Sequence, residues 1–155
     1  MKITTKLMLA ALLVAVPTMA WSCSDDDDDN RKESITVEQL PQASRTFIAD
    51  YYPGVSVLRV TKETEHSGSE YDVNLANGHE IEFNAAGEWT DVDAPTGQTV
   101  PAGIAPKAIV EYVTANYPDQ GINEISRDRK GYEVDLTSGL DLEFDTNGNF
   151  IRIDR

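Results

Sequence analysis

Residues 132–153 read YEVDLTSGLDLEFDTNGNFIRI, and the pattern of this stretch decides the fold. Apolar residues alternate with acidic or polar ones along two segments, and Gly139 and Gly148 punctuate the alternation. A period of two that is interrupted by turn residues is typical of antiparallel strands joined by tight turns. The stretch therefore predicts a β-meander.

The same pattern occurs earlier in the chain, in residues 71–92, as YDVNLANGHEIEFNAAGEWTDV. The two copies match at strand and turn positions: Tyr71 with Tyr132, Gly78 with Gly139, Phe83 with Phe144, and Gly87 with Gly148. The chain of 155 residues is therefore a tandem repeat.

An amphipathic helix is expected before each meander, because apolar residues recur there at three- and four-residue spacing. The first apolar face holds Leu40, Ala43, Phe47, Ile48 and Tyr51, and the second holds Ile109, Val110, Val113 and Tyr117, with Tyr112 beside it. Each helix is expected to end at a Tyr-Pro pair, because proline disfavours the helical conformation in the residue before it.

The predicted fold class is α+β. It consists of tandem α-β-β-β-β repeats that form an antiparallel sheet, with the helices packed on one face and the other face open. We expect one repeat over residues 37–93, a linker rich in proline and glycine over 94–105, and a second repeat over 106–155. One helix on four strands has a thin core, so the two repeats are expected to share one.

The N-terminus indicates export. Residues 1–22 combine two lysines with an apolar run too short to span a bilayer, which predicts a signal peptide. The segment from Ala20 to Cys23 resembles a bacterial lipobox, whose cysteine is lipidated and becomes the mature N-terminus. Cys23 is the single cysteine of the chain, so it forms no internal disulfide. Cleavage after Ala20, which would give a soluble periplasmic protein, is the alternative.

Residues 23–36 are expected to form a lipidated acidic tether. Five consecutive aspartates, residues 25–29, repel one another and bury nothing. The run also resembles the export signal of surface-displayed lipoproteins in some Gram-negative groups, with a plain spacer as the alternative. The expected location is the cell envelope, on the outer membrane, with surface exposure as one orientation.

The formal net charge of −14 argues against a nucleic-acid partner, because phosphate binding needs clustered basic residues. It is compatible with a basic partner, with a divalent cation, or with solvation alone. The sequence contains no nucleophile elbow, phosphate loop or Cys–His pair, so we predict neither an enzyme nor a cofactor.

Metal-site signals are weak. The turn at residues 145–149 resembles part of a calcium loop but lacks the glycine placement and distal glutamate of an EF-hand, so a hairpin turn is expected. His66 and His79 each lack a second ligand at metal-binding spacing. We predict no metal site.

The candidate binding site is the sheet face opposite the helices. Alternation points one set of polar side chains to this open face: Asp72, Asn74, Glu80, Glu82, Glu133, Asp135, Asp141 and Glu143. Strict alternation would add Trp89 and Phe150 as exposed aromatic anchors. A bulge at each turn would instead tuck both rings against the neighbouring strand.

One motif occurs twice: a helix ending in Tyr-Pro, then Tyr-acid-Val-x-Leu, a glycine, and Ile/Leu-Glu-Phe-Asp/Asn-x-x-Gly. It resembles the PepSY-like family, also called β-lactamase-inhibitor-like, over residues 37–155. The resemblance implies small secreted or lipid-anchored proteins with protein-binding or inhibitory roles. The predicted function is that of a noncatalytic envelope lipoprotein that binds an extracytoplasmic protein or peptide through the open acidic face. Inhibition of the bound partner is one version of this function. Capture of a cation or glycan, or a structural role in the envelope, is the alternative.

Overall fold

The structure is a computed structural model that describes residues 31–65 and 68–154. The predicted signal peptide, Cys23, the aspartate run and His66 lie outside the described residues. Within the described ranges, no helix is both long enough and apolar enough to cross a membrane.

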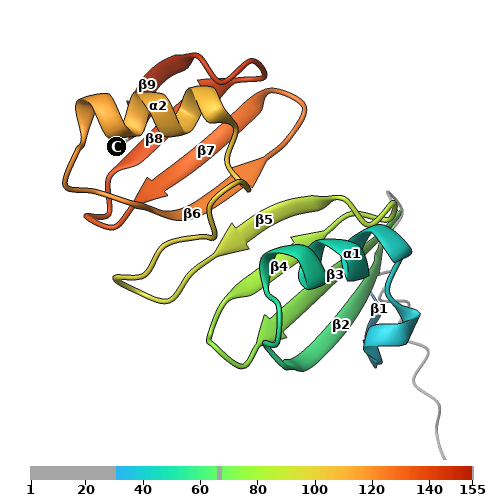
Figure 1. The fold of residues 1–155 in the computed structure, drawn as a ribbon. Coiled ribbons are helices and arrows are strands. Elements are labelled where there is room, and N and C mark those ends of the chain that lie inside the picture. The colour runs from blue at the N-terminus through green and yellow to red at the C-terminus, as the bar shows by residue number, and fades with distance from the viewer. Residues whose placement is uncertain (1–30, 66–67, 155) are drawn as a thin grey trace, which may run out of the picture.

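All strands form one antiparallel sheet in which the spatial order follows the order of the chain (Figure 1). The nine strands are β1 (Arg31–Ile35), β2 (Val57–Glu65), β3 (Gly68–Leu75), β4 (Glu80–Phe83), β5 (Trp89–Asp93), β6 (Ile122–Arg127), β7 (Gly131–Leu136), β8 (Asp141–Asp145) and β9 (Phe150–Asp154). The α+β class with a repeated meander and an open sheet is confirmed.

Both α-helices lie on the same face of the sheet (Figure 1). Helix α1 (Gln42–Tyr51) follows the short 3-10 helix η1 (Val37–Gln39) and joins β1 to β2, whereas α2 (Lys107–Asn116) joins β5 to β6. Proline precedes each helix directly, and the tyrosine of each Tyr-Pro pair is the C-cap that follows the last helical residue, so both helices stop where predicted. The two halves therefore share one topology, in which a helix is followed by four strands: α1 by β2 to β5, and α2 by β6 to β9.

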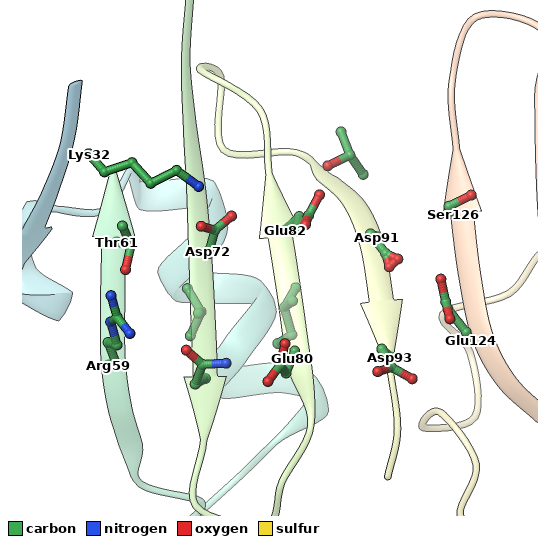
Figure 2. Close-up of a pocket in the computed structure, with 14 residues that line it drawn as sticks. Lys32, Arg59, Thr61, Asp72, Glu80, Glu82, Asp91, Asp93, Glu124 and Ser126 are labelled. Atoms are coloured by element: carbon green, nitrogen blue, oxygen red, sulfur yellow. The ribbon is translucent and has the colours of Figure 1, made fainter. Parts of the chain in front are cut away.

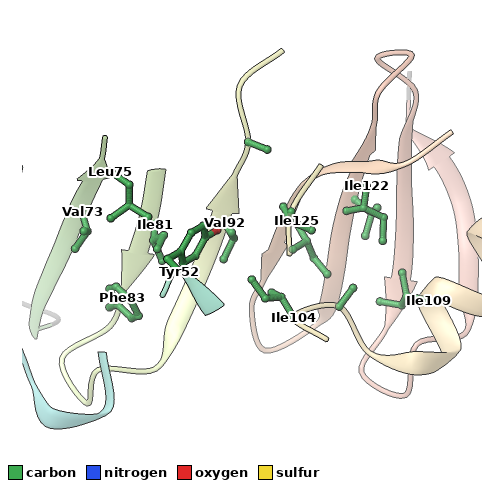
Figure 3. Close-up of a cluster of buried hydrophobic side chains, with 14 of the residues drawn as sticks. Tyr52, Val73, Leu75, Ile81, Phe83, Val92, Ile104, Ile109, Ile122 and Ile125 are labelled. Carbon is green, nitrogen blue, oxygen red and sulfur yellow. The ribbon is translucent and has the colours of Figure 1, made fainter. Parts of the chain in front are cut away.

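Equivalent aromatic side chains hold each helix on the sheet. Phe83 and Phe144 are buried, and each receives an aromatic ring edge-on from its helix, Phe47 at 5.6 Å and Tyr112 at 5.4 Å between ring centroids. The buried residues of both halves belong to one hydrophobic cluster, part of which is shown in Figure 3. The predicted orientation of the sheet is therefore confirmed.

The connection between the halves is packed rather than loose. Val100 and Ile104 are buried, and the Asn123 side-chain amide donates hydrogen bonds to the carbonyl oxygens of Ala94, Pro95 and Gln98 at 2.8 to 3.2 Å. Since Asn123 belongs to β6 and Ala94 directly follows β5, these bonds help to set the two halves side by side.

Two sequence expectations are wrong. Residues 31–36 belong to the predicted tether, but Arg31–Ile35 forms β1, because the exposed edge of β2 offers its backbone groups to a partner strand. Ala43 and Val110 were expected on the apolar helix faces, but both are exposed. In α1 the buried small residue is Ser44, whose hydroxyl donates to the carbonyl oxygen of Gly87 at 3.2 Å.

Candidate functional site: the open acidic face

The register of the strands aligns the open-face residues into two rows that cross the sheet from β2 to β9. Row one is Arg59, Asn74, Glu80, Asp93, Glu124, Asp135, Asp141 and Asp154. Row two is Thr61, Asp72, Glu82, Asp91, Ser126, Glu133, Glu143 and Arg152. Alternate residues of a strand point to one face, so each row is a line of side chains on the same surface.

All eight polar residues predicted for the open face lie in these rows. The structure adds Asp91, Asp93 and Glu124, which line the junction between the repeats. Their signal was present in the sequence, since Asp91 and Asp93 flank the buried Val92, and Glu124 precedes the buried Ile125. Only the pairing of β5 with β6 brings them beside the predicted residues.

A shallow hollow of about 680 Å³ lies over the rows between β2 and β6 (Figure 2). Its carboxylates are Asp72, Glu80, Glu82, Asp91, Asp93 and Glu124. Lys32 and Arg59 lie at the β1–β2 end of the hollow, and apolar side chains of β3 and β4 also contribute to its lining. A second hollow of about 440 Å³ continues along β6 to β9 and includes Glu133, Glu143 and Arg152.

Crowding and partial burial change the acidity of the central carboxyls. Burial, followed by the charges of Glu124 and Glu82, raises the pKa of Asp91 to about 8. Burial and the charge of Asp135 also raise the pKa of Glu124, which shares a hydrogen bond with Asp91. Burial and the neighbouring Asp141 raise the pKa of Asp135 to about 6. With its pKa raised to about 8, the Asp91 carboxyl favours the protonated form at neutral pH, and a bound cationic group would favour its ionised form.

Basic side chains lie at the two ends of the rows and not in the middle. At the β1 end, Lys32 Nζ lies 2.6 Å from Glu63 Oε2, and at the β9 end Arg152 pairs with Glu143. Between Arg59 and Arg152, neither row contains a lysine or an arginine. The surface between β3 and β8 is therefore a continuous acidic strip.

Trp89 and Phe150 are not on the open face. A bulge interrupts the β4–β5 pairing beside Trp89, and another interrupts the β8–β9 pairing beside Phe150. Both rings point to the helices: Phe150 stacks on Tyr112 at 4.6 Å, and Trp89 lies 6.5 Å from Phe47. Of the two placements that the sequence left open, the structure has the tucked one, so neither ring belongs to the candidate site.

The turn at residues 145–149 is a hairpin turn, as expected. Asp145 Oδ1 accepts the backbone N–H groups of Asn147 and Asn149 at 2.9 and 2.8 Å, and bonds from these residues hold the pKa of Asp145 below its usual range. His79 is buried, with Nδ1 3.2 Å from the Tyr52 hydroxyl. In residues 31–65 and 68–154, no group of three or more His, Cys, Asp or Glu side chains converges to hold a metal ion.

Comparison with known families identifies the family of this chain. The family model described as "Putative beta-lactamase-inhibitor-like, PepSY-like" matches residues 69–152, which include the first meander and all but the last residue of the second. The chain belongs to the PepSY-like family. No curated protein matches this PepSY-like chain.

Three solved structures of similar proteins come from Bacteroides species. A "putative periplasmic protein" of the DUF2874 family from Bacteroides vulgatus is 39% identical, with a TM-score of 0.75, over 85% of this chain and 99% of its own. A "putative calcium-regulated periplasmic protein" from Bacteroides thetaiotaomicron is 38% identical, with a TM-score of 0.76, over 80% and 97%. A "putative periplasmic protein of unknown function" from Bacteroides vulgatus is 35% identical, with a TM-score of 0.75, over 81% and 99%. None of these descriptions names a catalytic activity.

Proposed function

We propose that this protein is a noncatalytic binding module of the cell envelope, anchored through a lipid on Cys23, and that its open acidic face binds a basic segment of an extracytoplasmic protein or peptide. The observation that carries the proposal is the pair of carboxylate rows, which runs without an interrupting basic residue from β3 to β8. The similar proteins described as periplasmic support the compartment.

The geometry of the rows favours a partner with several basic groups over a single small cation. Neighbouring strands are about 4.8 Å apart, so carboxylates recur at about this spacing along each row. Lysine and arginine side chains reach such a strip from one extended segment, and each arginine can contact two carboxylate oxygens at once. Burial, followed by the charge of Asp72, raises the pKa of Glu82, and a bound cationic segment would offset the repulsion between these carboxylates.

The experiment is a calorimetric titration of the purified protein with a peptide rich in lysine and arginine, at low and high salt. The double variant Asp72→Asn, Glu80→Gln removes two carboxyl groups of the hollow and is expected to weaken binding about tenfold, or about 1.4 kcal/mol. The matched control is Glu111→Gln, which removes an exposed carboxylate that pairs with Lys107 on α2, away from the open face.

Two further readouts separate specific binding from general attraction. Binding at pH 7 to 8 should release protons, because a bound cation lowers the pKa of Asp91. The binding enthalpy measured in buffers of different ionisation enthalpy will report that release. The proposal fails if the peptide does not bind at low salt, or if the control variant weakens binding as much as the double variant does.

Inhibition of a bound enzyme is one form that this function can take, in keeping with the description of the family. A periplasmic β-lactamase is therefore the first enzyme to assay. Inhibition should be saturable and should weaken with the double variant, whereas an unchanged β-lactamase rate at saturating protein would leave binding without inhibition.

Calcium capture is the second candidate, and the similar protein described as "calcium-regulated" favours it. Calcium prefers six to eight oxygen ligands, which adjacent carboxylates can supply in part. A calcium titration after treatment with a chelator, on the same variants and control, tests it. Saturable calcium binding that blocks the basic peptide would place both ligands on one face.

A further inference from the structure

The repeat makes β9 the counterpart of β5, but the two strands have different surroundings. Strand β5 is paired on both sides, with β4 and with β6. Among the residues that the structure describes, β9 pairs only with β8. The outer edge of β9 therefore corresponds to the edge by which β5 binds the next repeat.

The exposed side chains of β9 reflect this difference. Val92 of β5 is fully buried, since Ile125 of β6 lies opposite it, whereas its counterpart Ile153 is 38% exposed. The neighbouring Ile151 is 55% exposed. These are two of the four exposed large hydrophobic residues in the described part of the chain, and an exposed apolar strand edge favours pairing with another strand.

We propose that β9 pairs with β9 of a second copy of this chain, antiparallel, about a twofold axis that passes beside Ile153. In this register Ile153 lies opposite Ile153 of the partner subunit on the helix face. On the open face, Arg152 lies opposite Asp154 of the partner subunit, and Asp154 opposite the partner's Arg152. A twofold contact requires a self-complementary surface, and this strand provides two opposite-charge pairs around one apolar pair.

The other edge of the sheet does not offer the same complementarity. Strand β1 covers β2 in the position that β5 occupies beside β6, and its residues Arg31, Lys32, Glu33 and Ser34 are all exposed. Charged residues on an edge strand oppose pairing with further strands unless each meets an opposite charge, as Arg152 and Asp154 do in the proposed register. The proposed contact therefore uses β9 alone and closes as a dimer, in which the acidic rows of both copies form one surface.

Disulfide cross-linking of the full chain in bacterial envelopes tests the register. Directly opposed residues of antiparallel strands have Cα atoms about 4.5 to 5.5 Å apart, which a disulfide can bridge. Ile153→Cys is expected to give a disulfide-linked dimer on oxidation. The control Leu58→Cys replaces a side chain that is 70% exposed on β2, and neither it nor the parent chain, whose one cysteine is Cys23, should give that dimer.

Charge variants in the Ile153→Cys chain test the pairing independently. Arg152→Asp and Asp154→Arg each place like charges opposite one another, so each variant alone should lose most of the cross-linked dimer. Co-expressed with different tags, the two variants should cross-link to each other at the parental level, because opposite charges then face one another at both positions. Arg129→Asp, in the exposed turn before β7, should leave the dimer unchanged.

The proposal is overturned if Ile153→Cys cross-links no more than Leu58→Cys. It is also overturned if the co-expressed charge variants fail to recover the dimer, or if either variant alone keeps it. Loss of basic-peptide binding in the open-face variants would not change these results, so failure of the dimer and failure of the proposed function can be told apart.

Discussion

Truncation of Phe83 or Phe144 to alanine tests whether the two helices and the sheet form one core. Each ring is at most 1% exposed and packs edge-on against an aromatic side chain of its helix. Removing such a ring costs the transfer free energy of its carbons and leaves a cavity that the sheet cannot close. We expect either variant to lower the free energy of unfolding by about 4 kcal/mol, at the middle of the range for buried phenylalanine.

The assay is urea denaturation followed by circular dichroism and tryptophan fluorescence. With a denaturant slope of about 2 kcal/mol per molar urea, each variant should shift the midpoint by about 2 M. We expect one transition by both probes, because buried residues of both halves belong to one cluster. The control Leu58→Ala, at an exposed position, should cost within about 0.5 kcal/mol.

Two results would refute this reasoning. A loss below about 1 kcal/mol for Phe83→Ala would mean that the ring is not in a close-packed core. Two separate transitions, each moved by only one of the substitutions, would mean that the repeats fold independently in spite of the β5–β6 pairing.

Asp91→Asn should stabilise the protein above about pH 8 and have little effect near pH 4. The reason is that the raised pKa of Asp91 makes wild-type stability fall as the pH rises from 3.8 to about 8. Melting curves across this range test the prediction, and a stability difference independent of pH would contradict it. Gly87→Ala should cost about 3 kcal/mol, against about 1 kcal/mol for Gly139→Ala, in chemical denaturation. Both glycines have positive φ, but an added Cβ at Gly87 would lie 2.6 Å from Pro41 Cβ, whereas Gly139 faces open space. Cys23→Ala should abolish fatty-acid labelling and partitioning into detergent, and absence of label in the unmutated protein would favour cleavage after Ala20.

Much of the fold could be predicted because its signals are local. Alternation with a period of two defines the faces of β3, β4, β7 and β8, and glycines at the turns separate the strands. The same alternation correctly assigned eight polar residues to the open face. Val110 was misplaced because an apolar residue beside the apolar face of a short helix satisfies the same spacing whether or not the sheet reaches it.

Other features depend on contacts between residues distant in the chain. β1 has no apolar alternation in RKESI and becomes a strand only because the backbone of β2 is available to it. Two bulges turn Trp89 and Phe150 towards the helices, where Phe47 and Tyr112 offer aromatic surface.

The sequence by itself determined the repeat, the strand faces and the acidic character of one face, because each depends on residue type at short spacing. Tertiary structure alone decided that the two acidic faces join into continuous rows. That alignment requires the register of β5 on β6. Two features set this register: Val92 lies opposite Ile125, and the Asn123 side chain bonds to the connecting segment. Both join residues that are about thirty positions apart in the chain. A shift of one residue at this junction would turn the side chains of one repeat to the opposite face, so the junction determines whether the protein presents one acidic surface or two.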